Sequence, residues 1–195
     1  RERAFIFGLI TMETPSWRVE DYLDELEQLA DTAGAEVIER VVQERERRDP
    51  AFMIGRGKAE ELARTARYQD ADLIISDDDL TPAQAKKIEK LCGVKIVDRS
   101  ALILDIFAKH ARTREARTQV ELAQLQYLLP RLTGQWRHLE RQVGGIGVRG
   151  PGETQLEVDR RLVRKRVAVL QKELEKIAGQ REIRRGERAR THPVE

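Results

Sequence analysis

The sequence predicts an α/β fold: a small four-stranded, mostly parallel sheet with flanking helices, followed by a long antiparallel two-helix hairpin of coiled-coil type. Short apolar runs alternate with amphipathic segments up to residue 98, and strand-like runs then cease. Two stretches with heptad spacing flank a glycine-rich loop at 144–152. Strands separated by helices of this length are normally parallel with right-handed crossovers. The predicted divisions are a domain at 1–108, a basic hairpin at 109–180 and a linker remnant at 181–195.

The four strands are predicted from compact apolar runs, too short for helices and rich in Val and Ile. They are expected at 4–10, 35–43, 72–76 and 94–97. In the second run the apolar residues come in adjacent pairs, so one face of that strand is expected to be only partly covered.

Three helices are predicted between these strands from their spacing and their end signals. The first has Ser16 as its N-cap, apolar residues at three- and four-residue steps, and Gly34 at its end. The second is expected at 58–68. The third begins with a capping box at Thr81-Pro82-Ala83-Gln84 and stops at Gly93.

The second half of the chain is predicted to be helical. Ser100 is expected to cap a helix that runs on into the basic half, and Pro130 should kink it. A heptad seam on this arm is formed by Leu122, Leu125, Leu129, Leu132, Trp136, Leu139 and Val143. A second capping box, Thr154 with Glu157, begins the other arm. Its seam is formed by Val163, Val167, Leu170, Leu174 and Ile177. Beyond Gly179 the seam gives way to Arg-rich sequence, either frayed helix or linker.

Charge is distributed unevenly along the chain. Residues 1–108 carry 16 Lys and Arg against 23 Asp and Glu, a net charge of −7. Residues 109–195 carry 20 against 11, a net charge of +9. An acidic half joined to a basic half suggests two surfaces with different partners, although a long, solvated, Arg-rich helix would show the same excess.

Composition also excludes several classes of protein. A single cysteine, Cys92, excludes an internal disulfide framework and a Cys-based zinc cluster. The longest apolar stretches are too short to span a bilayer, and no secretory signal is visible. His110, His138 and His192 form no metal-binding or catalytic constellation, so no metal site and no catalytic residue are predicted. We therefore expect a cytoplasmic protein without a membrane partner.

The loop at 144–152 is the most informative feature of the sequence. It has five glycines in nine residues, and Arg149 is its one long side chain. This is longer than closing a hairpin requires. A loop with few side chains can bring backbone amides close to an anionic surface, which at the end of a long arm suits insertion into a narrow space. The alternative is a tip without function.

Arginines are concentrated on both arms. Those of the first arm are Arg112, Arg114, Arg117, Arg131, Arg137 and Arg141. The second arm carries Arg160, Arg161, Arg164, Lys165 and Arg166, with few acidic neighbours in the sequence. Because the planar guanidinium pairs well with phosphate oxygens, these groups favour contact with an RNA backbone over a merely solvated face. Tyr127 and Trp136 could stack on bases, but Trp136 lies on the seam and is better read as core.

Two further motifs have alternative interpretations. The segment Gly55-Arg56-Gly57-Lys58 precedes the second helix and could hold a phosphate at the helix N-terminus, or could be only a turn and N-cap. The segment Asp77-Asp78-Asp79 ends the third strand, at an edge where parallel sheets bind ligands. A hard cation could bind there, but an acidic approach to the next helix explains the same residues.

Several motifs in order resemble the N-terminal region of HflX-type GTPases. They include 98–107, Ala111-Arg112-Thr113-Arg114-Glu115, 120–125, Leu129-Pro130-Arg131-Leu132, and 144–153 followed by Thr154-Gln155-Leu156-Glu157. Gly55-Arg56-Gly57-Lys58 with Glu60-Glu61-Leu62 is similar to an early glycine motif of that family. The resemblance covers nearly the whole chain and is strongest over 94–160.

The resemblance implies a protein that binds the large ribosomal subunit and splits stalled or idle ribosomes, particularly under heat stress. It implies that the hairpin enters the peptidyl-transferase region with the glycine-rich loop at its tip. The RNA contacts expected on this basis and on charge are Gly144, Gly145, Gly147, Arg149, Gly150, Gly152, Arg137, Arg141, Arg160, Arg161, Arg164 and Lys165.

One part of the family's pattern is not found in these 195 residues. In the family a GTPase domain with a Walker-type loop and magnesium ligands follows this region, yet no Gly-x-x-x-x-Gly-Lys-Ser/Thr occurs here. We therefore expect no GTP hydrolysis by these residues. GTP and magnesium belong to the missing domain, which is an expected partner. A nucleotide-binding α/β domain that uses Gly55 to Lys58 is the alternative function. A self-pairing coiled coil is a third, but the two seams satisfy one another, so a monomer is expected.

Overall fold

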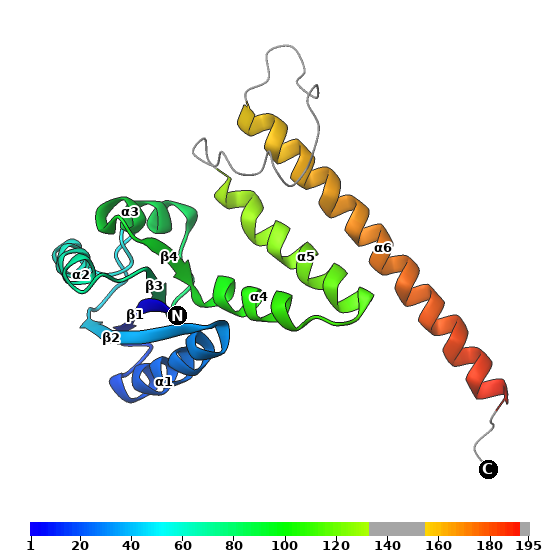
Figure 1. The fold of residues 1–195 in the computed structure, drawn as a ribbon, viewed down its shortest axis with the longest axis horizontal. Helices are drawn as coiled ribbons and strands as arrows, with labels where there is room; N and C mark the ends of the chain where they lie inside the picture. Colours follow the sequence, from blue (N-terminus) through cyan, green and yellow to red (C-terminus); the bar gives the residue numbers. More distant parts are fainter. Residues whose placement is uncertain (133–154, 192–195) are drawn as a thin grey trace. The chain divides into compact units, whose positions relative to one another are not determined.

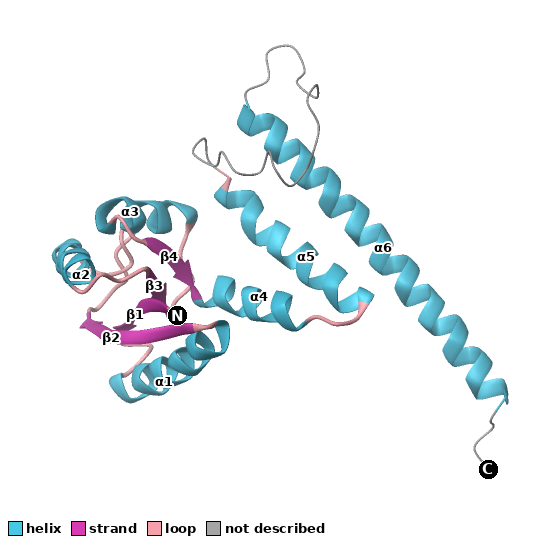
Figure 2. Ribbon diagram, in the orientation of Figure 1, coloured by secondary structure: helices cyan, strands magenta, loops and turns pink. Residues whose placement is uncertain are grey.

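The computed structural model describes residues 1–132 and 155–191. The chain divides into two compact units, Arg1–Lys109 and His110–Glu195, which we call unit 1 and unit 2. Unit 1 contains a sheet with helices on both faces, and unit 2 contains a pair of helices (Figures 1 and 2). In the described part of the chain, no helix is long and apolar enough to cross a membrane.

The sheet of unit 1 has four parallel strands, as the sequence predicts. They are β1 (Glu2–Ile10), β2 (Ala35–Glu44), β3 (Leu73–Ser76) and β4 (Lys95–Asp98). Their order is β2-β1-β3-β4, so the two buried strands, β1 and β3, lie at the centre. The pairing of β1 with β2 shifts register between Ala4 and Phe5.

Helices cover both faces of this sheet. They are α1 (Ser16–Ala33), α2 (Arg56–Tyr68), α3 (Pro82–Cys92) and α4 (Arg99–His110). Because successive side chains of a strand point to opposite faces, Ile6 of β1 packs in a core with residues of α1 and α4. Its neighbours Phe5 and Phe7 pack in a second core with residues of α2 and α3. These two apolar layers hold unit 1 together.

Some helices begin and end at the residues that the sequence predicts, and others do not. The capping box of Thr81 and Gln84 is present, and Gly34 and Gly93 end their helices at φ 96° and 69°. The N-cap of α1 is Pro15, one residue before the predicted Ser16. The N-cap predicted for α4 is also wrong.

Asp98, rather than Ser100, supplies the cap of α4. Its Oδ1 accepts a hydrogen bond from the Ala101 N–H at 2.9 Å, and its Oδ2 accepts one from the Leu80 N–H at 3.2 Å. Asp98 is only 2% exposed at the end of β4. One buried carboxylate thus joins the end of a strand, the start of a helix and the loop before α3.

Unit 2 consists of α5 (Arg114–Leu128), a 3-10 turn η1 (Leu129–Arg131) and α6 (Gln155–Thr191). The prediction of one helix continuing from Ser100 is wrong. The chain leaves the helix after His110, and Thr113 starts α5 by accepting a hydrogen bond from the Ala116 N–H at 3.1 Å.

Pro130 interrupts the first arm as expected, because it lies within η1 and Leu132 after it is extended. Helix α6 continues through Gly179 to Thr191, so residues 181–191 are helical. The tip at 144–152, the arm residues 133–143 and the capping residue Thr154 lie outside the described residues.

Candidate nucleic-acid interface

The described parts of the two arms, α5 and α6, lie side by side and pack through an apolar seam (Figure 1). On α6 the seam contains the residues that the heptad spacing predicts: Val163 and Leu170 are buried, and Val167, Leu174 and Ile177 are half-buried. On α5 the predicted Leu122 and Leu125 are half-buried. The seam fixes which side of α6 faces its partner helix and therefore which side faces solvent.

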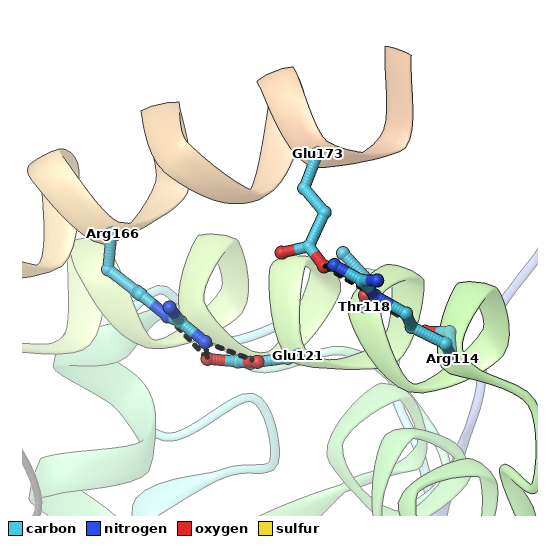
Figure 3. Close-up of polar contacts among 5 residues, drawn as sticks. All are labelled: Arg114, Thr118, Glu121, Arg166 and Glu173. Carbon is cyan, nitrogen blue, oxygen red and sulfur yellow. Dashed lines mark hydrogen bonds and ion pairs between the residues drawn. The ribbon is translucent and has the colours of Figure 1, made fainter. Parts of the chain in front are cut away.

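Two ion pairs cross the seam and show that the helices are antiparallel (Figure 3). Arg166 of α6 donates from Nε and Nη2 to the two carboxylate oxygens of Glu121, at 2.7 and 2.9 Å. Arg114 of α5 donates from Nε and Nη2 to Oε1 of Glu173, at 2.9 and 2.6 Å. A third pair joins Arg181 to Glu115 at 2.8 Å.

These pairs change the interpretation of two arginines that the sequence groups with the RNA-facing cations. Arg166 has few acidic neighbours on its own helix, but Glu121 of α5 neutralises it. The hydrogen bonds that Arg166 donates to this carboxylate are the main cause of the raised pKa of Arg166. Arg114 is engaged by Glu173 in the same way. Both guanidinium groups therefore stabilise the contact between α5 and α6.

Two further side chains also have partners within unit 2. Arg160 is half-buried and donates from Nη2 to the Leu132 carbonyl at 3.0 Å. The Arg131 guanidinium lies 3.6 Å from the centroid of the Tyr127 ring and donates to the Tyr127 carbonyl at 3.1 Å. The ring that could have stacked on a base is therefore covered on one face by an arginine of the same chain.

Several exposed cations of α6 lie on the side away from the seam, whereas the exposed Arg166 and Arg181 pair with glutamates of α5. Arg161, Arg164 and Lys165, which the sequence singles out, are exposed. Lys172 and Lys176 are exposed too and were missed. At about 100° per residue, Arg164, Lys165, Lys172 and Lys176 fall within a sector of about 120° opposite the seam. We call these four residues the outer face of α6. The positions of the predicted seam residues on α6 already imply that these four residues lie together on the opposite side of the helix.

Eight of the predicted RNA contacts belong to the segment 133–154. They lie outside the described residues and are Arg137, Arg141, Gly144, Gly145, Gly147, Arg149, Gly150 and Gly152. They remain predictions.

The alternative phosphate site lies at the start of α2, where Gly55 is the N-cap. The Gly55 N–H donates to Oε1 of Gln43 at 2.7 Å. Arg56 pairs with Glu60 and Lys58 with Glu61, each at 3.0 Å. Both cations of the motif are thus engaged by carboxylates of their own helix.

The acidic segment after β3 binds arginines. Asp77 pairs with Arg99 at 2.7 Å, and Asp78 pairs with Arg48 at 2.9 Å. Burial raises the pKa of Asp77, and Arg99 opposes that rise. Among the described residues, no three His, Cys, Asp or Glu side chains are grouped so as to hold a metal ion. The phosphate site at Gly55 to Lys58 stays a prediction.

Comparison with known proteins gives the class to which the chain belongs. Residues 20–108 match the family described as GTP-binding GTPase N-terminal, and residues 110–188 match GTP-binding GTPase Middle Region. The boundary between the two matches coincides with the boundary between units 1 and 2. The chain belongs to the HflX family of GTPases, of which it comprises the N-terminal and middle regions.

The relatives are similar over most of this chain. The GTPase HflX of Flavobacterium psychrophilum is 51% identical over 187 residues, which is 96% of this chain and 45% of that protein. HflX of Escherichia coli is 49% identical over 160 residues, 82% of this chain and 38% of that protein. The chain thus spans less than half the length of these relatives.

Two crystal structures share the fold. One is SsGBP in complex with GDP, with a TM-score of 0.65 at 23% identity, covering 93% of this chain and 46% of that one. The other is a GTP-binding protein from the archaeon Sulfolobus solfataricus with GDP, with a TM-score of 0.60 at 23% identity, covering 91% and 46%. At this identity the similarity concerns the fold alone.

Proposed function

We propose that this chain is the ribosome-binding part of an HflX-type GTPase, and that unit 2 contacts RNA of the large ribosomal subunit. The outer face of α6 carries this proposal, because its cations are exposed while Arg114 and Arg166 are engaged within the helix pair. The glycine-rich loop at 144–152 would supply the tip that approaches the RNA most closely. In the cytoplasm, such binding would serve the splitting of stalled ribosomes.

The charge of unit 2 supports an RNA partner on physical grounds. Residues 110–195 carry 19 Lys and Arg against 11 Asp and Glu, a net charge of +8, and a polyanion that binds such a surface releases condensed counterions. This release is a large and salt-dependent part of the free energy of binding. Unit 1, with its net charge of −6 over residues 1–109, is the less suitable surface for RNA.

Hydrolysis of GTP is assigned to a different part of the family's proteins. We propose that GTP and magnesium are bound by the GTPase domain, whose coupling to ribosome binding would pass through its contact with this region. Gly55, Lys58 and Asp77 have partners within unit 1, and no Walker-type loop occurs in these 195 residues, so we propose no nucleotide site there. The chain is proposed to act as a monomer, which light scattering would test.

Co-sedimentation of the 195-residue chain with purified large ribosomal subunits tests the proposal. Binding should weaken steeply with salt, with a log–log slope of about −0.9 for each neutralised phosphate. The double variant Arg164→Ala/Lys165→Ala should weaken binding and reduce the magnitude of the slope by about two units, whereas Arg149→Ala tests the tip. The matched control is Lys86→Ala/Lys87→Ala, two exposed cations of α3 in unit 1.

Unchanged binding of the unit 2 variants would contradict the proposal. If Arg164→Ala/Lys165→Ala and Arg149→Ala both bind subunits as the unmodified chain does, RNA contact by unit 2 is wrong. Equal losses in the α3 control and the α6 variant would indicate non-specific charge attraction instead.

A further inference from the structure

The outer face of α6 is a nearly straight array of cations. From Arg164 to Lys176 it spans about 18 Å at 1.5 Å per residue. The acidic Glu175 also falls in this sector, so the sector contains more cations than anions but is not purely cationic. Because long Lys and Arg side chains reach outward from a regular helix, the spacing of the charges is set by the backbone.

The seam makes this array rigid. Leu170, at the middle of the same stretch, is 1% exposed, and the pairs Arg166–Glu121 and Arg114–Glu173 fix α6 against α5 on either side of it. A rigid row of cations is complementary to a polyanion that is itself rigid. A flexible single strand would lose conformational entropy on following it, which reduces the affinity gained from each contact.

The array also lacks the groups with which proteins hold single strands. Such sites combine cations with aromatic rings on which bases stack. Within the described residues of unit 2, Tyr127 is the one Phe, Tyr or Trp, and it lies on α5 under the Arg131 guanidinium. The outer face of α6 therefore offers charge without stacking surface.

Resting on the proposed function, we infer that the outer face of α6 binds double-helical RNA along its phosphate backbone, without reading the base sequence. The wide, shallow minor groove of A-form RNA leaves the phosphates of both strands accessible to a helix lying across it. Phosphate contacts of this kind position a protein and carry no sequence information.

Fluorescence anisotropy with the 195-residue chain tests this inference. The probes are two RNA duplexes of about 20 base pairs with unrelated sequences, and a single-stranded poly(U) of the same length. The duplexes should bind within about twofold of each other and at least about tenfold more tightly than poly(U). Lys172→Ala/Lys176→Ala should weaken duplex binding by roughly five- to tenfold per cation removed near 0.1 M salt. Lys86→Ala/Lys90→Ala on α3 is the matched control and should leave it unchanged.

The outcomes separate this inference from the proposed function. Equal or tighter binding of poly(U), or duplex affinity unchanged in Lys172→Ala/Lys176→Ala, overturns the inference. If these variants still sediment with large subunits while Arg149→Ala does not, the ribosome-binding proposal stands and the tip alone carries it. A preference of more than about tenfold for one duplex sequence would show base readout and would also overturn the inference.

Discussion

Arg166 and Glu121 meet across the seam of α5 and α6 in a two-pronged ion pair, and one heptad along each helix Arg114 and Glu173 form a pair of the reverse polarity (Figure 3). This arrangement specifies the register of the helix pair. A slip of seven residues in one direction would bring Arg114 opposite Arg166, and a slip in the other would bring Glu121 opposite Glu173. The apolar heptads alone tolerate such slips, so the charges decide among them.

Reversal of one charge should therefore weaken the helix pair. In Arg166→Glu the new carboxylate faces Glu121, and the free energy of unfolding should fall by about 1 kcal/mol, a small value because both side chains are more than a third exposed. The swap Glu121→Arg/Arg166→Glu should restore most of the loss. Urea unfolding followed by far-UV circular dichroism measures both.

The control for this prediction is Arg164→Glu, which makes the same charge change on the outer face. It should alter the free energy of unfolding by less than about 0.5 kcal/mol. The register assignment is wrong if the double swap is as unstable as the sum of its two single variants.

Asp98 should be among the most sensitive polar residues of unit 1. Asp98→Ala removes the acceptor of both the Ala101 and the Leu80 N–H groups and should cost about 2–3 kcal/mol of stability. Asp98→Asn keeps one acceptor oxygen and should cost less. Ser100→Ala, at the cap position that the sequence suggests, should have little effect in the same thermal unfolding experiment; a cost equal to that of Asp98→Ala would contradict the assignment.

Two glycines give opposite predictions for the same substitution. At Gly8, an added Cβ would lie 2.9 Å from Cγ1 of Val19 on α1, so Gly8→Ala should destabilise the chain by about 1–3 kcal/mol. At Gly57, in the first turn of α2, nothing lies within 4 Å, and Gly57→Ala should stabilise it by up to about 1 kcal/mol. Chemical denaturation compares them, and a stabilised Gly8→Ala would show that β1 and α1 are less closely packed.

Lys58 provides a test of the alternative function, nucleotide binding at the start of α2. Because no Gly-x-x-x-x-Gly-Lys-Ser/Thr occurs in these 195 residues and Lys58 pairs with Glu61, calorimetry with ATP or GTP and magnesium should give no binding heat with this chain. Tight binding that is lost in Lys58→Ala would establish the nucleotide-binding alternative.

Cys92 should be unreactive in the folded protein. It is fully buried, and burial raises the pKa of its thiol from 9.0 to about 11. Since the folded pKa exceeds the unfolded one, this group's contribution to stability is complete below pH 9.0 and is lost as the pH rises towards 11. Maleimide labelling at about pH 8 should be slow in buffer and rapid in urea, where the thiol is exposed. Cys92→Ala should show a smaller loss of stability at alkaline pH.

The sequence predicts unit 1 well because its signals are local. The strands and helices between residues 2 and 98 have their own apolar periods, and several have their own end signals, as the capping box at Thr81 illustrates. The N-cap of α4 escaped prediction because Asp98 is the last residue of a strand, and its second partner, Leu80, is brought to it only by the folded sheet.

For the candidate site, the sequence reveals the excess of cations and the heptad seams but not which cations are engaged. Glu121 and Arg166 are 45 residues apart, and nothing in the local sequence of either indicates the other. The exposure of Lys172 and Lys176 could have been predicted, because at about 100° per residue both lie on the side of α6 opposite the seam.

The sequence by itself determined the order of the elements, the parallel sheet, the apolar seam and the basic character of unit 2, because periodicity and charge reside in neighbouring residues. Only the tertiary structure decided which arginines neutralise glutamates and which cations remain on the outer face of α6. That decision depends on the register of two helices, which is set by side chains far apart in the chain and close together only after folding.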